Sequence, residues 1–102
     1  MTGERPSTRV PFDEHKLQRV REFLRREFRS CQHRDVFAFH RTAQVFVIGS
    51  DHSLRHTLVI PKETFEDQDF ALLLNPHLVT TLKLAGEARV TLTPQGARTS
   101  TG

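Results

Sequence analysis

The sequence predicts one α+β domain in which helices cover a small antiparallel meander sheet, with the element order α-β-β-β-α and a further short strand at the end. Three observations predict this class. Apolar side chains recur at helical spacing between residues 17 and 28, strand-like segments follow between 36 and 60, and a second helical pattern begins after Asn75. A chain of 102 residues has the size of one domain, so a single hydrophobic core is expected.

The first helix is predicted at about residues 14–29, with Asp13 placed to cap its N-terminus. Its apolar stripe consists of Leu17, Val20, Leu24 and Phe28, with Phe23 at the edge. At about 100° per residue, the opposite face carries Arg19, Glu22, Arg25, Arg26 and Arg29. This face is therefore expected to be solvated and mostly positive.

Three strands are predicted after the first helix, at residues 36–40, 45–48 and 54–60. They are rich in aromatic and β-branched side chains. Because the connections between them are too short for parallel crossovers, we expect an antiparallel meander. Pro61 ends the third strand. The side chains expected to share one face of that strand are Leu54, His56, Leu58 and Ile60.

A second helix is predicted at residues 76–85, after a segment at 61–74 that is expected to form one or two short helical turns. Asparagine is a preferred N-cap and proline is favoured at the first helical position, so Asn75 and Pro76 mark where this helix begins. Gly86 suits the residue that closes it. The apolar stripe of this helix is Leu78, Val79, Leu82 and Ala85.

The last predicted element is an edge strand at residues 89–93, stopped by turn residues at 94–96. The polar N-terminus shows no apolar periodicity. We therefore expect a flexible arm at 1–11, one globular domain at 12–93 and a disordered tail at 94–102.

Composition indicates a reducing, aqueous compartment. No stretch reaches the roughly 20 apolar residues needed to cross a bilayer, and the N-terminus lacks the apolar segment of a secretory signal. The single cysteine, Cys31, cannot form an internal disulfide. We expect a cytoplasmic protein without a membrane partner.

Positive charge is concentrated in the first third of the chain. Residues 1–34 contain nine Lys and Arg against five Asp and Glu, whereas the remainder contains six against seven. Clustered arginines favour nucleic acid as a partner, because they supply phosphate affinity without a sequence motif. The residues assigned to this binding are Arg19, Arg25, Arg26, Arg29 and Arg34. The plainer interpretation is a solvated face, in which Glu22 and Arg26 form an i,i+4 pair.

A homodimeric protein-interaction or adaptor domain is the second class of function. Phe37, Phe39 and Phe46 in the first two strands predict apolar surface on both faces of the sheet. One face would then pack on the helices and the other on a second subunit. The alternative is that the helices and the segment at 61–74 cover both faces.

A small enzyme or metal-binding protein is the third class and the least favoured. The chain contains no glycine-rich phosphate loop and no Gly-x-Ser-x-Gly motif. The pairs Cys31/His33 and His52/His56 lack the further ligands that a tetrahedral metal site needs. We therefore expect a non-enzymatic binding module with no catalytic residue, no metal site and no cofactor.

Overall fold

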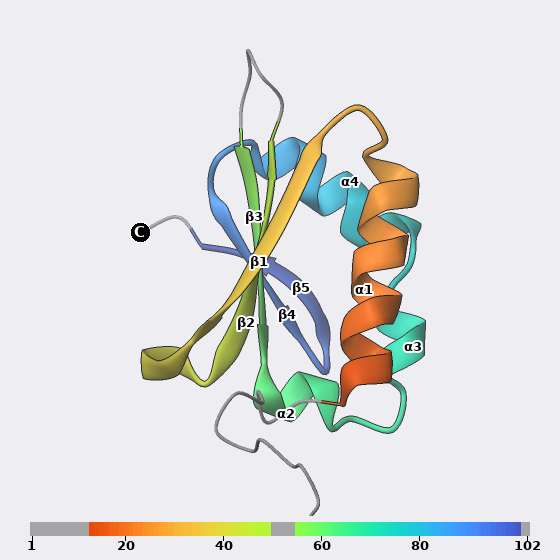
Figure 1. Cartoon of the computed structure of the whole chain (residues 1–102), viewed down its shortest axis with the longest axis vertical. Coiled ribbons are helices and arrows are strands. Elements are labelled where there is room, and N and C mark those ends of the chain that lie inside the picture. Colours follow the sequence, from red (N-terminus) through yellow and green to blue (C-terminus); the bar gives the residue numbers. More distant parts are fainter. Residues whose placement is uncertain (1–12, 50–54, 101–102) are drawn as a thin grey trace, which may run out of the picture.

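A computed structural model describes residues 13–49 and 55–100. The predicted class is confirmed, since helices accompany a small and mostly antiparallel sheet (Figure 1). The arm predicted at 1–11, and Leu54 at the start of the third predicted strand, lie outside the described residues. The elements in chain order are α1 (Glu14–Glu27), β1 (Gln32–Ala38), the 3-10 helix η2 (Phe39–Arg41), β2 (Ala43–Gly49), β3 (Arg55–Pro61), α2 (Lys62–Phe65), α3 (Phe70–Leu73), α4 (Pro76–Ala85), β4 (Arg89–Thr93) and β5 (Gly96–Thr99).

The sheet has five strands in the spatial order β1-β2-β3-β4-β5. β1, β2 and β3 form the predicted antiparallel meander. β4 is parallel to β3, because the chain passes through α2, α3 and α4 before it returns to the sheet. The prediction of β4 as an edge strand is wrong, since β4 lies between β3 and β5.

The end of the chain forms a strand that the sequence analysis does not predict. Thr93 Oγ1 donates to the carbonyl oxygen of Gly96 at 2.9 Å and accepts from the backbone N–H of Gln95 at 3.1 Å. Gly96 has φ 124°, which favours glycine, and the turn reverses the chain so that β5 pairs with β4. The predicted disordered tail at 94–102 is therefore wrong for residues 96–99.

The predicted boundaries of α1 and β1 also shift. α1 ends at Glu27 instead of residue 29, because Phe28 leaves helical geometry, with φ −127° and ψ 65°, and buries its ring in the core. β1 occupies Gln32–Ala38 instead of 36–40, because the backbone pairs with β2 along residues 32–35 although these side chains are polar. Phe39 and His40 belong to η2, which links β1 to β2.

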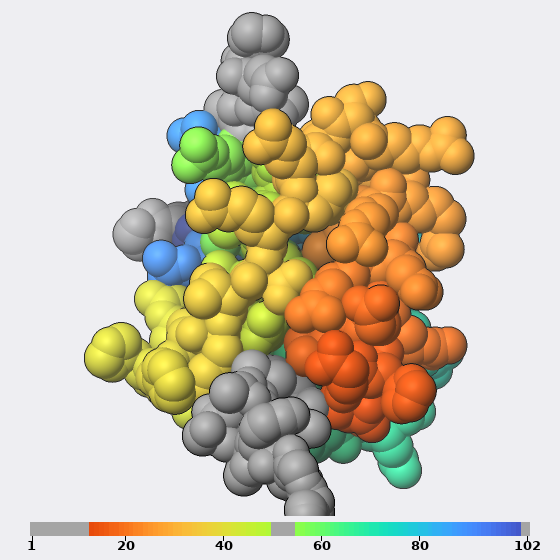
Figure 2. Space-filling model, viewed as in Figure 1, coloured from red at the N-terminus to blue at the C-terminus, as the bar shows by residue number. Residues whose placement is uncertain are grey.

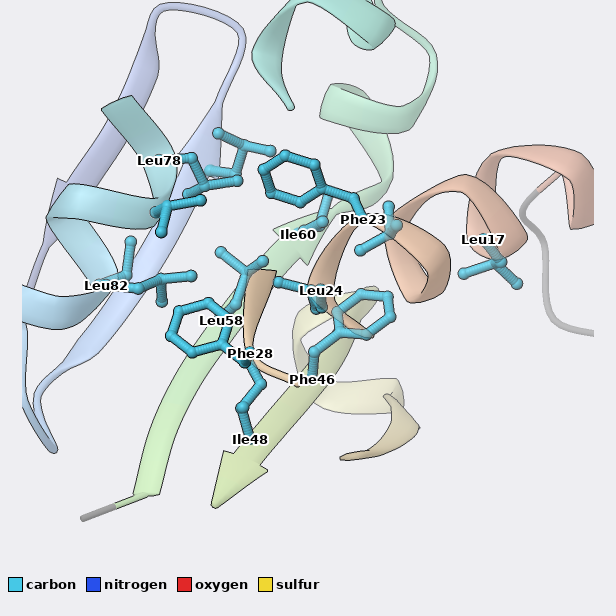
Figure 3. Close-up of a cluster of buried hydrophobic side chains, with 14 of the residues drawn as sticks. Leu17, Phe23, Leu24, Phe28, Phe46, Ile48, Leu58, Ile60, Leu78 and Leu82 are labelled. Carbon is cyan, nitrogen blue, oxygen red and sulfur yellow. The ribbon is translucent and has the colours of Figure 1, made fainter. Parts of the chain in front are cut away.

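The helices α1, α3 and α4 lie on one side of the sheet (Figure 1). The hydrophobic core fills the space between the sheet and these helices, with Leu24 of α1 and Leu82 of α4 pointing toward the strands (Figure 3). The inward apolar side chains of the three central strands are Phe46, Ile48, Leu58, Ile60, Val90 and Leu92. In the part of the chain that the structure describes, no helix covers the opposite face of the sheet.

The predicted helix at 76–85 is confirmed together with its caps. The Asn75 side chain accepts a hydrogen bond from the backbone N–H of Leu78 at 3.1 Å, and its Nδ2 donates to the carbonyl oxygen of Leu72 at 2.7 Å. Gly86 closes the helix with φ 62°. Asn75 therefore joins α3 to α4 as well as capping α4.

Replacement of this cap gives a first test. Asn75→Ala is expected to lower the free energy of unfolding by about 0.5–2 kcal/mol, because a helix donor loses its acceptor. Asn75→Asp keeps the acceptor oxygen and is expected to lower the free energy of unfolding by a smaller amount. Urea unfolding followed by circular dichroism measures both variants, and equal losses would contradict the role of the side-chain oxygen as a cap.

Candidate functional site

The first helix presents arginines to solvent, as predicted. The helix arginine surface is defined by four exposed residues, Arg19, Arg25, Arg26 and Arg29. Arg26 lies 3.8 Å from a carboxylate oxygen of Glu27, and its guanidinium lies over the Phe23 ring at 5.9 Å from the centroid. The other three arginines form no ion pair with an acidic residue of the described chain. They are therefore accessible to an anionic ligand.

Acidic side chains interrupt this surface. Within the described residues the predicted pair of Glu22 with Arg26 does not form, because Arg26 pairs with Glu27. Glu22 instead borders a hollow of about 220 Å³ between α1 and α3. The hollow is lined by Arg19, Glu22, Phe23, Arg26, Ala71 and Leu74. Its mixed charge makes it a weaker anion site than the number of its arginines suggests.

Arg21 has a structural role that the sequence analysis does not assign. Its Nε and Nη2 donate to the two carboxylate oxygens of Asp35 at 3.0 and 2.9 Å, and Gln44 Nε2 donates to the same carboxylate at 2.8 Å. This bidentate pair ties α1 to β1. The signal in the sequence was the position of Arg21 beside the apolar stripe, four residues after Leu17 and three before Leu24.

The environment of Asp35 favours its charged form. Partial burial acts to raise the pKa of Asp35, but hydrogen bonds from Arg21 and Gln44 and the charges of Arg21 and Arg25 outweigh it, so the pKa is below the ordinary value. The hydrogen bond to Asp35 is also the main cause that raises the pKa of Arg21. Arg25 and Asp35 line one small cavity, so the helix arginine surface reaches the border between α1 and β1.

Two histidines bind the ends of helices. His33 Nε2 donates to the carbonyl oxygen of Phe28 just after α1, and His56 Nδ1 donates to the carbonyl oxygen of Gly86 just after α4, each at 3.0 Å. These nitrogens are therefore occupied by structural hydrogen bonds. Within residues 13–49 and 55–100, no group of three or more His, Cys, Asp and Glu side chains is arranged to hold a metal ion.

Arg34 is separated from the other predicted site residues. The side chains of β1 alternate, so His33 and Asp35 point toward α1 while Arg34 points to the opposite face of the sheet. Arg34 nevertheless remains close to the helix, since it borders with Arg25 a small cavity of about 20 Å³. α1 and β1 lie side by side on the molecular surface (Figure 2).

Three further arginines join Arg34 on the face that no described helix covers. The sheet arginine surface is defined by four exposed residues, Arg34, Arg55, Arg89 and Arg98. Arg34 and Arg55 line a shallow cavity of about 160 Å³ with Gln32, Val47 and Gly49. Arg55, Arg89 and Arg98 were not predicted as site residues, because they lie far apart in the chain and only strand register brings them together.

No family model matches the chain, and neither the curated proteins nor the solved structures contain a match. In the part of the chain that the structure describes, no helix is long and apolar enough to cross a membrane.

Proposed function

We propose that this protein is a nucleic-acid-binding module that contacts phosphates through the helix arginine surface. The observation that carries the proposal is the exposure of Arg19, Arg25 and Arg29 without an ion pair to any acidic residue of the described chain. A guanidinium binds phosphate in a bidentate geometry, and the release of counterions makes such binding favourable at low salt.

The homodimer alternative has less support. Phe46 is buried in the core and Phe37 packs against the core side of the sheet, so neither ring contributes to the opposite face. Phe39 is 80% exposed, but it lies in η2 at the end of the sheet. Two copies joined through the opposite face would also bring their sheet arginine surfaces together, which like-charge repulsion disfavours. Nucleic acid is the better match to the exposed charge.

The proposal is tested by fluorescence anisotropy with a labelled mixed-sequence oligonucleotide over a series of salt concentrations. The variant Arg19→Gln/Arg25→Gln removes two of the three guanidinium groups of this surface that form no ion pair within the described residues. It is expected to weaken binding and to reduce the slope of log affinity against log salt by about 1.8, since each lost phosphate contact accounts for about 0.9. Both side chains are exposed, so the fold should be retained.

The matched control is Arg41→Gln/Lys83→Gln, which removes the same charge from exposed residues outside both arginine surfaces. This control is expected to leave the slope close to that of the wild-type protein. Absence of salt-sensitive binding at low salt would overturn the proposal. An equal reduction of the salt slope in the control and in the helix variant would show that only net charge matters. That result would also overturn the proposal.

A further inference from the structure

On the outward face of the sheet, every charged residue of the described strands is a cation. The outward positions of the five strands alternate with those that face the helices, so the register identifies them, and two of them, Ala43 and Val59, are buried. They are Gln32, Arg34, Val36 and Ala38 in β1, Ala43, Val45, Val47 and Gly49 in β2, Arg55, Thr57, Val59 and Pro61 in β3, Arg89, Thr91 and Thr93 in β4, and Gly96 and Arg98 in β5. None of these residues is acidic. This face is therefore more uniformly positive than the helix arginine surface, which includes Glu22 and Glu27.

The four arginines are spaced across the whole sheet. Arg34, Val47, Thr57 and Arg89 occupy one row, because each is the register partner of the next. At about 4.8 Å per strand, the Cα atoms of Arg34 and Arg89 are separated by about 14 Å. Arg98 lies opposite Thr91, two residues along β4 from Arg89. Arg55 lies between them on the central strand β3, near the end of the sheet where β2 finishes.

Gly49 helps to place Arg55. The two residues are register partners, and a Cβ atom at Gly49 would lie only 3.0 Å from Cγ of Arg55. The absence of a side chain at Gly49 lets the aliphatic part of Arg55 lie across β2. This position brings Arg55 toward Arg34, with which it lines the shallow cavity described above.

We infer that the sheet arginine surface binds the phosphate backbone of a nucleic-acid duplex. The outward positions contain no aromatic side chain on which an unpaired base would stack, so a single strand gains little here beyond phosphate contacts. Thr57 and Thr91 add hydroxyl donors of the kind that contact phosphate oxygens. The span of about 14 Å is comparable to the roughly 12 Å width of the major groove of B-DNA, which phosphates border on both sides.

The two arginine surfaces are continuous around β1. Arg25 and Arg34 border one cavity, and Arg34 and Arg55 border the next. A duplex on the sheet face would therefore extend phosphate contacts that begin at the helix arginine surface. The inference rests on the proposed function, because it concerns the same ligand. It adds a second contact surface for the nucleic acid and specifies that the nucleic acid is double-stranded.

The test uses the full chain and three labelled probes of one mixed sequence: a 20-base-pair DNA duplex, the matching RNA duplex and the DNA single strand. The variant Arg55→Gln/Arg89→Gln is expected to reduce the salt slope for a duplex by about 1.8, while the Arg41→Gln/Lys83→Gln control does not. Duplex is expected to bind more tightly than single strand. Tight binding of either the DNA or the RNA duplex supports the inference and identifies which one the surface prefers.

Two outcomes separate this inference from the proposed function, and a third overturns both. If only the Arg19→Gln/Arg25→Gln variant lowers the slope, the proposed function stands and the sheet surface is not a contact. If the single strand binds as tightly as the duplex, the assignment of a duplex is wrong. Polyglutamate serves as a polyanion that is not a nucleic acid. If no probe binds at low salt, or if polyglutamate binds as tightly as the duplexes, both the proposed function and this inference are wrong. Circular dichroism of each variant verifies that its fold is retained.

Discussion

Phe46→Ala is expected to lower the free energy of unfolding by about 3–5 kcal/mol. The Phe46 side chain is 2% exposed and lies on β2, where it points into the core between the sheet and α1 (Figure 3). Its register partners are Asp35 in β1 and Leu58 in β3, so rigid backbone surrounds the site and limits collapse into the cavity. The total stability of a domain of this size is typically about 5–15 kcal/mol, so the loss is severe.

Urea unfolding followed by far-UV circular dichroism measures this loss, because the chain contains no tryptophan or tyrosine to report by fluorescence. Phe39→Ala is the matched control, since it makes the same chemical change at a ring that is 80% exposed. The control is expected to cost less than about 0.5 kcal/mol. Similar losses in the two variants would contradict the assignment of Phe46 to the core.

Asp35→Asn is expected to lower the free energy of unfolding at pH 7 by about 1.5–3 kcal/mol, the usual contribution of hydrogen bonds to charged groups. The substitution removes the charge that pairs with Arg21 and leaves the guanidinium partly buried beside a neutral amide. It also disturbs the hydrogen bond from Gln44. Because this network joins α1 to β1, its loss should loosen the border that both arginine surfaces share.

The pH dependence of stability gives a second measurement on the same residue. The folded-state pKa of Asp35 is below its unfolded value, so its contribution is present above the unfolded pKa of about 3.9 and is lost as the pH falls through the folded value. Asp35→Asn should therefore lose less stability than the wild-type protein does as the pH falls below about 3.9.

The control for this experiment is Glu14→Gln. Glu14 contacts the same guanidinium at 3.4 Å, but its side chain is 72% exposed, so solvent screens the pair. Its substitution is expected to change stability by less than about 1 kcal/mol and to leave the acid transition close to that of the wild-type protein. If Asp35→Asn loses as much stability at acid pH as the wild-type protein does, the lowered pKa of Asp35 is contradicted.

Tertiary structure also separates the charges of residues 35–102. This part of the chain contains more acidic than basic residues, and none of the residues predicted to bind nucleic acid lies in it. Yet it supplies Arg55, Arg89 and Arg98 to one face of the sheet, while Glu63 and Glu66 belong to the short helix α2 and the residue after it. Net charge along the chain is therefore a poor guide to the charge of a surface built from several strands.

The sequence by itself determined the elements that depend on neighbouring residues. The start of α1, both ends of α4 and the antiparallel pairing of the first three strands follow from capping side chains, apolar periodicity and short connections. These signals act within a few residues, so a single sequence is enough to detect them.

Only the tertiary structure decided where β4 and β5 lie and which arginines share a surface. β4 inserts beside β3 after a crossover, and β5 is a four-residue strand with a single small apolar side chain, Ala97, so its local pattern is weak. The sheet arginine surface depends on both strands, because Arg89 and Arg98 reach it only through hydrogen bonding between segments distant in sequence. Register across a sheet is a non-local property, and no pattern within one segment specifies it.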